Sequence, residues 1–374
     1  VLRSCLEKGQ MTLVFHHIVG NGSIFAPGKC VYSGIWRARR KINAVALTPK
    51  HIDKFVSVYA RNSQVMADKL AVYVPTTNMY LSFIETILGN SVNLHPREFQ
   101  PFCEAFISYF DNVITRLCRP WLYNITMYKL LPEATKQSLK KKIVQQGELK
   151  SLLELLITKS GYSEAELREE SLVLLLASID TTVSVNGFAS VLLSQHLDVQ
   201  DKVYEEIKNV FDDFHQTITI DDLNKLKYLE AVLKETMRLY PTTPLIMRKC
   251  LKDVKLPSGL VLSEGCQVLV NIWGLHRNPK YWGPDADKFR PERFLDITPE
   301  QQSAFIPFSS GPRNCAGNRI GMISLKTTMV TILRKYRLKP AASFVYDEQN
   351  PLRVKHTLVT KHLDNFQVQL EHRV

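Results

Sequence analysis

One stretch of this sequence presents a single cysteine in a glycine-flanked loop: Phe308-Ser309-Ser310-Gly311-Pro312-Arg313-Asn314-Cys315-Ala316-Gly317. The glycines allow the backbone to turn sharply and to approach a flat ligand, and Pro312 stiffens the loop. A helical pattern begins directly afterwards, and the free amide groups at a helix start can hydrogen-bond to sulfur. The stretch therefore predicts a thiolate that is presented to a metal.

An isolated Cys-x-Gly would usually be a buried, inert cysteine. The full pattern, Phe-x-x-Gly-x-Arg-x-Cys-x-Gly, resembles the haem-ligand signature of the cytochrome P450 family, the haem-thiolate monooxygenases, at every fixed position. The resemblance implies that the Cys315 thiolate is the axial ligand of an otherwise non-covalently bound haem b, which Gly311 and Gly317 let the loop approach. It also implies that Arg313 pairs with a haem propionate and that Phe308 packs against the loop, although Phe308 is equally compatible with a core aromatic.

A long helix is predicted upstream of this loop. Ser163 and Glu166 form a capping box, and the helical pattern runs from there toward Gln195. The pattern is apolar on nearly every side, which predicts a buried helix, but Asp180 and Thr181 interrupt it. A threonine hydroxyl that bonds back to its own helix is the simpler explanation. The segment also resembles the family's oxygen-activation segment, which implies that Thr181, assisted by Asp180, relays protons to the oxygen being activated.

Two positions of this helix depart from the family pattern. Ser178 stands where glycine is usual, and serine is small enough to keep the helix open there. Ala177 stands where many fatty-acid ω-hydroxylases of family 4 have a glutamate that can esterify haem, so covalent attachment by that route is excluded. The segments 119–122 and 166–170 nevertheless resemble family 4 and its insect, microsomal members.

A buried ion-pair triad is expected behind the cysteine loop. Glu235 and Arg238 lie three residues apart in a helix predicted over Leu223 to Leu239. Alone they would form a surface ion pair worth at most about 1 kcal/mol. Together with Arg293 they resemble the family's Glu-Arg-Arg triad, which implies a structural rather than a catalytic role.

Further segments resemble the family's haem-propionate partners and its substrate pocket. Trp36 and Arg40 match the family's Trp-x-x-x-Arg, and Arg248 ends an apolar loop similar to one that lines the pocket. A surface arginine is the alternative for Arg248. The resemblance implies a mostly apolar pocket for fatty-acid-like, terpenoid or xenobiotic substrates. The pocket walls that it names are Leu174, Ser178, Thr243, Leu245 and Ile246.

The composition is that of an ordinary globular protein. With 374 residues, 45% of them hydrophobic, the chain can form a large core, and we expect one domain over residues 1–374, mainly α-helical with a small β region. Short antiparallel strands are predicted between Val254 and Asn271, and a terminal hairpin is expected to touch substrate with its tip near His362 to Asn365. Seven cysteines without a Cys-x-x-Cys pair argue against a disulfide framework and for a reducing compartment.

Membrane association is expected only outside the residues given. The longest strictly apolar run of the central helix, Leu172 to Ala177, is far shorter than the ~20 residues that span a bilayer. Microsomal members of the resembled family carry an anchor, a hinge and a first sheet ahead of the point where this chain starts, so we expect a chain truncated at its front. The full-length protein would then lie at the cytoplasmic face of the endoplasmic reticulum membrane.

The formal charge of +12 suggests an acidic partner. In the resembled fold two basic clusters flank the cysteine side of the haem, which implies docking of an NADPH-dependent cytochrome P450 reductase; scattered solvated side chains are the alternative. The sequence contains no zinc-finger spacing, aromatic-basic motif or basic zipper, so nucleic-acid binding is not expected. The clusters are Arg37, Arg39, Arg40 and Lys41, and Arg313, Arg319, Lys326, Arg334, Lys335, Arg337 and Lys339.

Together these features predict a haem-thiolate monooxygenase that inserts one oxygen atom from O2 into a lipophilic substrate, using electrons from a reductase. A rival hypothesis is a catalytically incompetent haem-binding fragment or splice or gene-model remnant, because the segment between Tyr123 and Lys150 is much shorter than in the resembled relatives. Such a gap would leave the pocket uncovered. A haem-thiolate isomerase of peroxides is disfavoured, because Asp180 and Thr181 supply the proton relay that oxygen cleavage needs.

Overall fold

The computed structural model describes residues 6–8, 40–41, 44, 48–69, 162–213, 216–341, 352–356 and 359–373. The chain divides into two compact units. Unit 1 comprises Val1–Leu6, Leu47–Pro75 and Ala177–Val374, and unit 2 comprises Glu7–Ala46 and Thr76–Leu176. The expected fold class, mainly α-helical with a small β region, is confirmed in the described residues.

The described part of unit 2 is dominated by the first turns of α8 (Glu164–Gln195). The predicted capping box starts this helix, since the Ser163 backbone N–H donates to Glu166 at 2.9 Å and the Glu166 N–H donates to the Ser163 hydroxyl at 3.4 Å. From Ala177 onward α8 belongs to unit 1. The short strand β1 (Leu6–Lys8) straddles the boundary between the two units.

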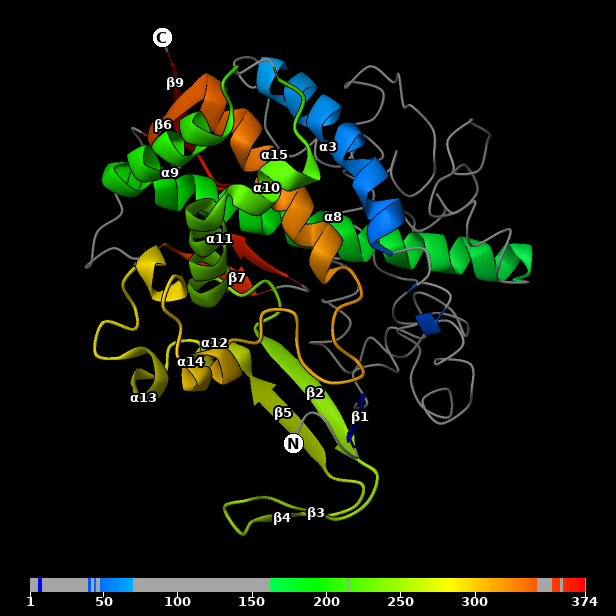
Figure 1. Cartoon of the computed structure of the whole chain (residues 1–374). Helices are drawn as coiled ribbons and strands as arrows, with labels where there is room; N and C mark the ends of the chain where they lie inside the picture. Colours follow the sequence, from blue (N-terminus) through cyan, green and yellow to red (C-terminus); the bar gives the residue numbers. More distant parts are fainter. Residues whose placement is uncertain are drawn as a thin grey trace, which may run out of the picture. The chain divides into compact units, whose positions relative to one another are not determined.

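The longer helices of unit 1 are grouped near the later part of α8 (Figure 1). The C-terminal helix α15 (Asn318–Lys335) packs along α3 (Pro49–Lys69). Directly after α15, the Tyr336 hydroxyl donates to the Ala67 carbonyl of α3 at 2.8 Å. The other helices are α9 (Leu197–Val210), α10 (Ile220–Lys225), α11 (Lys227–Leu239), α12 (Ile272–Leu275), α13 (Pro279–Trp282), the 3-10 helix η4 (Pro291–Phe294) and α14 (Pro299–Ala304). None of the described helices combines the length and the apolar character that crossing a bilayer requires.

A buried glutamine joins α8, α9 and the C-terminal sheet. Gln200 is fully buried, and its amide donates to the carbonyls of Leu193 and Leu338, both at 2.9 Å. Its side-chain oxygen accepts from the Leu338 N–H at 2.8 Å. Because each of these polar atoms has a partner, the amide can be buried at little cost.

The helix predicted over Leu223 to Leu239 is two helices. Leu226 leaves the helical region with φ −76° and ψ 81°, so α10 ends before it and α11 begins after it. The Leu226 side chain is fully buried. A capping box of Thr219 and Asp222 starts α10. The amphipathic pattern of the sequence matches both helices, but it does not indicate the buried break between them.

The strands form small antiparallel sheets at the periphery of unit 1. In the largest, β2 (Leu245–Cys250) pairs with β5 (Gln267–Asn271), and β3 (Val254–Lys255) and β4 (Val261–Leu262) form the far tip of the same hairpin (Figure 1). The strands expected between Val254 and Asn271 are therefore confirmed. Toward the C-terminus, β7 (Val354–His356) pairs with β8 (Thr360–His362).

The last strand corrects the expected terminal hairpin. β9 (Val368–His372) does not pair with the strand just before it; it pairs with β6 (Tyr336–Pro340), which directly follows α15. The pairing places Leu338 opposite Leu370. The apolar face of β9 is thus covered through a long-range contact, which alternation in the sequence cannot reveal.

Candidate functional site

The cysteine loop is a tight, internally bonded turn that ends where α15 begins. Gly311 has φ +83° and Ser309 has φ +60°, both in the left-handed region, which only glycine adopts without cost. The Cys315 N–H donates to the Phe308 carbonyl at 2.9 Å, which closes the loop on itself. Cys315 is left exposed three residues before α15. The geometry presents the sulfur at the positive end of a helix.

Gly317 also lies close to the sulfur. A Cβ atom built on this glycine would lie 3.9 Å from Cys315 Sγ, in ordinary van der Waals contact. Its φ of −94° makes no special demand on the residue type. Gly311 is therefore required by backbone conformation, whereas Gly317 keeps the surroundings of the thiol open.

A buried arginine lies against the same loop. Arg248 comes from β2, is only 5% exposed, and donates to the Ser309 hydroxyl at 3.1 Å and to the Met247 carbonyl at 3.0 Å. Burial lowers the pKa of its guanidinium below the ordinary value. Among the described residues no carboxylate pairs with it. A buried cation beside an exposed cysteine therefore offers a place for an anionic group of a ligand.

The other two predicted site residues of the loop, Arg313 and Phe308, are half-buried. Arg313 lies within the turn itself, and Phe308 lines a cavity of about 660 Å³ between α10, α11 and α15. Met237 and Met322 share the cavity wall with Phe308. This position fits both the expected packing against the loop and the alternative of a core aromatic.

Both threonines of the α8 segment bond back to their own helix. The Thr181 hydroxyl donates to the Ala177 carbonyl at 2.8 Å, and the Thr182 hydroxyl lies against the carbonyls of Ser178 and Ile179. This is the simpler explanation that the sequence allowed. The Thr181 oxygen still has lone pairs, so it can accept a hydrogen bond from a further donor.

Asp180 has a partner that the sequence did not indicate. Its carboxylate, in a side chain that is 12% exposed, lies 3.1 Å from the Lys361 ammonium group of β8. The preceding residue fixes β8 in place: Thr360 is fully buried, its hydroxyl donates to the Pro241 carbonyl at 2.8 Å, and its N–H donates to Thr242 at 2.9 Å. Three distant segments therefore meet at the polar interruption of α8. No motif marks Lys361; its only signal was its place beside the expected substrate-contacting tip.

The turn that follows β8 docks onto α8. Asn365 and Phe366 both have left-handed φ angles, 55° and 56°. The Phe366 ring lies over Gly187, where a Cβ atom would be only 2.6 Å from the ring, and meets Phe188 edge-on with centroids 4.9 Å apart. Glycine at this position therefore makes the notch that accepts the ring. Contact of the tip with substrate stays a prediction.

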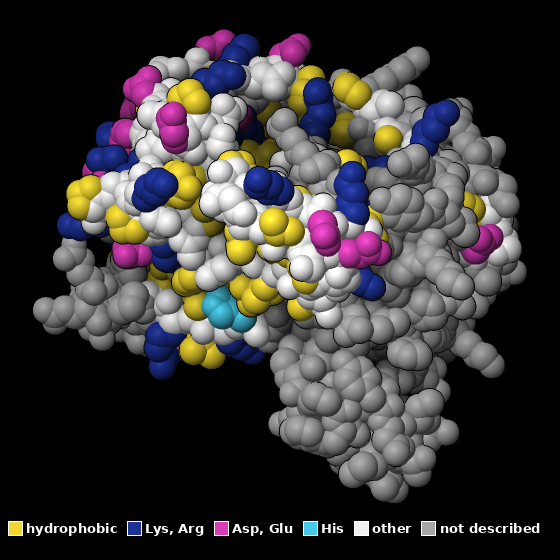
Figure 2. Space-filling view, turned by 90° about the horizontal axis from the view of Figure 1, so that it is seen from below, with side chains coloured by type: hydrophobic (Ala, Val, Ile, Leu, Met, Phe, Trp, Pro, Cys, Tyr) yellow, Lys and Arg dark blue, Asp and Glu magenta, His cyan; other side chains and the backbone are white. Residues whose placement is uncertain are grey.

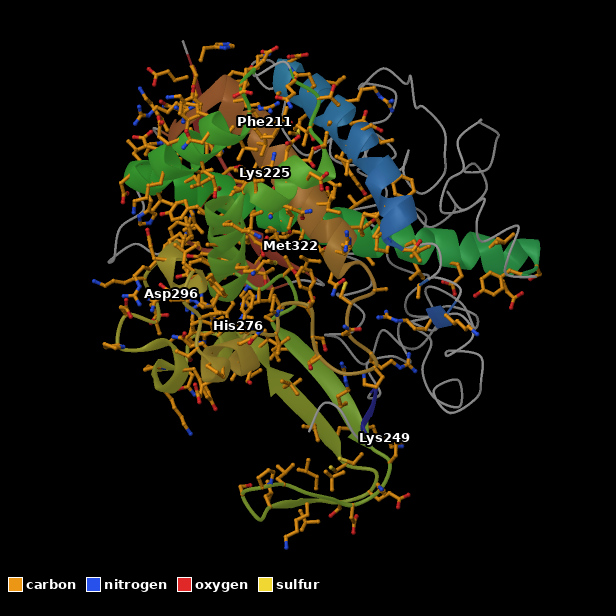
Figure 3. All side chains as sticks on the ribbon, viewed as in Figure 1. Phe211, Lys225, Lys249, His276, Asp296 and Met322 are labelled. Atoms are coloured by element: carbon orange, nitrogen blue, oxygen red, sulfur yellow. The ribbon has the colours of Figure 1, made fainter. Side chains whose placement is uncertain are left out.

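Behind the loop, a glutamate is surrounded by arginines. Glu235 and Arg238 have fully buried side chains, and two bonds of 2.7 and 2.8 Å join them. Arg293 Nε lies 3.3 Å from the same carboxylate, and the Arg290 N–H donates to it at 2.9 Å. Arg238 also donates to the His276 carbonyl at 2.8 Å (His276 is labelled in Figure 3). The cluster ties α11 to η4 and to the end of α12.

Most of the basic run after the cysteine is neutralised by ion pairs within unit 1. On the face drawn in Figure 2, Lys and Arg side chains lie dispersed among hydrophobic and acidic ones. Of the described cluster, Arg319 is exposed beside the loop. Four others form ion pairs: Lys326 with Glu230, Lys335 with Asp68, Arg337 with Asp201 and Lys339 with Glu371. The sequence therefore overstated how much free positive charge this run presents.

Several predicted site residues are not brought together by the described contacts. Trp36, Arg37 and Arg39 lie outside the described residues, as does the segment 123–150. Arg40 and Leu174 are half-buried residues of unit 2. The remaining predicted pocket walls belong to unit 1: Leu245 is 42% exposed, and Ser178, Thr243 and Ile246 are half-buried.

Comparisons of the sequence with known proteins identify the family. A family model described as Cytochrome P450 matches residues 32–366. Cytochrome P450 4V2 of Rattus norvegicus is 29% identical over 348 residues, covering 80% of this chain and 66% of the relative. Cytochrome P450 4d8 of Drosophila melanogaster is 30% identical over 386 residues, covering 90% and 82%. The probable cytochrome P450 313a1 of the same species is 38% identical over 192 residues, covering 50% of this chain and 39% of the relative. The chain thus spans less than two thirds of the rat and 313a1 relatives.

Proposed function

The chain belongs to the cytochrome P450 family, and from that premise we propose that it is a haem-thiolate monooxygenase acting on a lipophilic substrate. The resemblance to family 4 is confirmed by relatives named as members of that family. The observation that carries the proposal is the exposed Cys315 on a closed loop, with the buried Arg248 bonded to Ser309 of that loop.

The donor set fits haem b. Cys315 would provide the thiolate ligand of the iron, and Arg248 would pair with a propionate, which supplies the negative charge that its burial calls for. Arg313 would serve as a further propionate partner. When bound, haem supplies the activation of dioxygen and the insertion of one oxygen atom into a C–H bond. The hydrogen bond from the Cys315 amide to the Phe308 carbonyl fixes the backbone of the loop at the cysteine.

A proton pathway would run along the polar interruption of α8. The Thr181 hydroxyl donates to Ala177, so its oxygen can accept a proton donor from the pocket and pass a proton on. Asp180 would provide the acidic end of this pathway. Its ion pair with Lys361 holds the carboxylate in one orientation. Lys361 is thus a positioning residue rather than a proton carrier.

Substrate, partner and location follow the family. The pocket walls Leu245 and Ile246 are apolar, which suits fatty-acid-like, terpenoid or xenobiotic substrates. Electrons would come from an NADPH-dependent cytochrome P450 reductase, whose docking the exposed Arg319 beside the cysteine loop would assist. The site of action would be the cytoplasmic face of the endoplasmic reticulum membrane.

The test is the spectrum of the reduced carbon monoxide complex. The chain is expressed with a haem precursor, reduced with dithionite and exposed to carbon monoxide, and we expect the red-shifted Soret band that thiolate ligation gives. Cys315→Ser should lose this band. Cys266→Ser, which changes the cysteine directly before β5, should keep it. A chain that takes up no haem, or a band that survives Cys315→Ser, would overturn the proposal. A chain that binds haem through Cys315 but turns over nothing with reductase would instead favour the incompetent fragment.

A further inference from the structure

Two cysteines face each other across the long β hairpin. Cys250 is the last residue of β2, and Cys266 directly precedes β5. The Cys250 N–H donates to the Cys266 carbonyl at 2.9 Å, and the Cys266 thiol lies 3.3 Å from the Cys250 sulfur. Lys249, labelled in Figure 3, marks this end of β2, away from α12. The two sulfurs are therefore held together by a backbone ladder.

The local sequence explains why this pairing is specific. Gly265, with φ +82°, donates to the Cys250 carbonyl at 2.8 Å, so Gly265 and Cys266 together oppose one residue of β2. The Cys266 N–H returns to the Ser263 carbonyl at 3.1 Å. This is a tight turn followed by a glycine bulge, a combination that sets the register of the hairpin. A slip of one residue would lose the glycine from its left-handed position and separate the sulfurs.

The pair is close enough to react and is accessible from one side only. A disulfide bond is about 2.05 Å long, so the sulfurs would have to approach by about 1.3 Å from their present separation. Cys250 is fully buried, whereas Cys266 is half-buried. An oxidant would therefore reach Cys266 first, and Cys250 would be protected until Cys266 has reacted.

We propose that Cys250 and Cys266 form a reversible dithiol–disulfide site that hydrogen peroxide oxidises. The Cys266 thiolate attacks the peroxide, its S–O bond forms as the O–O bond breaks, and hydroxide leaves to give a sulfenic acid. The Cys250 sulfur then attacks Cys266, the S–S bond forms, and the sulfenic oxygen leaves with the Cys250 proton as water. Overall, two thiols and one peroxide give one disulfide and two waters, and a dithiol such as dithiothreitol reverses the step.

The modification would act on the strand that carries the propionate-binding candidate. Along β2 the buried positions are Arg248 and Cys250, so both side chains lie on the inward face of the strand. A bond at Cys250 would tie this strand to β5 two residues beyond Arg248. The disulfide would therefore keep fraying of the exposed β3–β4 tip from reaching Arg248. This effect can be measured without haem.

Peptide mapping tests the site directly. The full chain is treated with hydrogen peroxide at neutral pH, alkylated, and digested with trypsin without reduction. Cleavage after Lys249, Lys252 and Lys255 places Cys250 in peptide 250–252 and Cys266 in peptide 256–277. We expect these two peptides to appear linked, with two hydrogens lost, and to separate after dithiothreitol. Wild-type protein in which both thiols remain alkylatable, or in which Cys266 becomes a sulfinic acid without linkage, would overturn the proposal.

A second measurement keeps the test independent of folding defects. Cys266→Ser changes the half-buried partner and should fold, abolish the linked pair and leave Cys250 alkylatable after unfolding. In wild-type protein, oxidation should raise the midpoint of thermal unfolding and slow native trypsin cleavage at Lys252, and Cys266→Ser should show neither shift. A midpoint that falls on oxidation would mean that the bond strains the hairpin, and would refute the pairing geometry.

Discussion

The buried Glu235 carboxylate offers the sharpest test of what stabilises this fold. Its Oε2 accepts from Arg238 Nε at 2.7 Å, and its Oε1 accepts from Arg238 Nη2, the Arg290 N–H and Arg293 Nε. All three side chains of the ion-pair cluster are at most 1% exposed. Replacing Glu235 by Gln keeps the shape but removes the charge that two buried guanidinium groups share.

The size of the effect follows from these contacts. In Glu235→Gln one carboxylate oxygen becomes an NH2 group. The fewest bonds are lost when this group takes the place of Oε2, because Oε2 accepts from a single donor. Arg238 Nε then loses its acceptor, which costs about 1–3 kcal/mol, and the uncompensated buried charge raises the total to about 3–5 kcal/mol. Arg238 keeps its bonds to the carbonyls of His276 and Ala286, which prevents a larger loss.

Urea unfolding of the full chain, followed by circular dichroism, measures this change. The matched control is Glu292→Gln, the same substitution on η4 in a side chain that is 41% exposed and whose Oε1 accepts from Lys202 at 2.8 Å and from the Tyr228 hydroxyl at 2.7 Å, bonds that the Gln oxygen can keep. An exposed pair of this kind contributes at most about 1 kcal/mol. If Glu235→Gln lowers the free energy of unfolding by no more than Glu292→Gln does, the buried cluster does not stabilise the fold as argued.

Three further predictions concern other parts of unit 1. Burial, and to a smaller extent the charge of Arg238, lowers the pKa of His276 from 6.5 to about 3. As the pH falls, the histidine is therefore protonated in the unfolded chain before it is protonated in the folded one. The free energy of unfolding should be unaffected by His276 above pH 6.5 and should fall by about 1.4 kcal/mol per pH unit toward pH 3. Gly187→Ala places a Cβ 2.6 Å from the Phe366 ring, and the overpacking of about 1–3 kcal/mol should exceed the gain in helix propensity of about 1 kcal/mol and lower the urea midpoint. Lys361→Met removes the ion-pair partner of the Asp180 carboxylate. We expect the amount of product formed per oxygen consumed to fall by up to about tenfold, which corresponds to about 1.4 kcal/mol.

Each of these predictions has a control within the chain. His276→Gln should flatten the acid limb of the stability profile, and an unchanged slope would assign it to other groups. Gly321→Ala adds a Cβ with nothing within 4 Å, so an equal loss at both glycines would refute the notch at Gly187. Lys361→Arg keeps the charge and should restore coupling; if Met and Arg behave alike, the ion pair does not position Asp180.

Local chemistry was predictable because neighbours in the chain create it. The capping box at Ser163 appears in the structure as the sequence indicates, and so does the turn that leaves Cys315 exposed. In each case spacing alone determines which groups can meet, since a helix start or a glycine turn involves only a few residues. The bond from Thr181 to Ala177 belongs to the same class, because it stays within one helical turn.

Contacts between distant segments could not be predicted in this way. Nothing near Lys361 in the sequence indicates Asp180, and nothing near Phe366 indicates Gly187. The split of the predicted helix at Leu226 has the same origin, because the fully buried Leu226 side chain compensates for the helical hydrogen bonds lost at the break. Periodicity reports which face is apolar, but not which partner covers it.

By itself, the sequence determined the fold class, the exposed cysteine of the glycine-flanked loop and the polar interruption of the long helix, because these depend on residue types at short, fixed spacing. Only the tertiary structure decided how charge is distributed. It pairs Lys326, Lys335 and Arg337 with distant carboxylates, yet leaves Arg248 buried beside the cysteine loop without one among the described residues. The reason is that Coulomb energy depends on distance and burial, and both are properties of the folded chain.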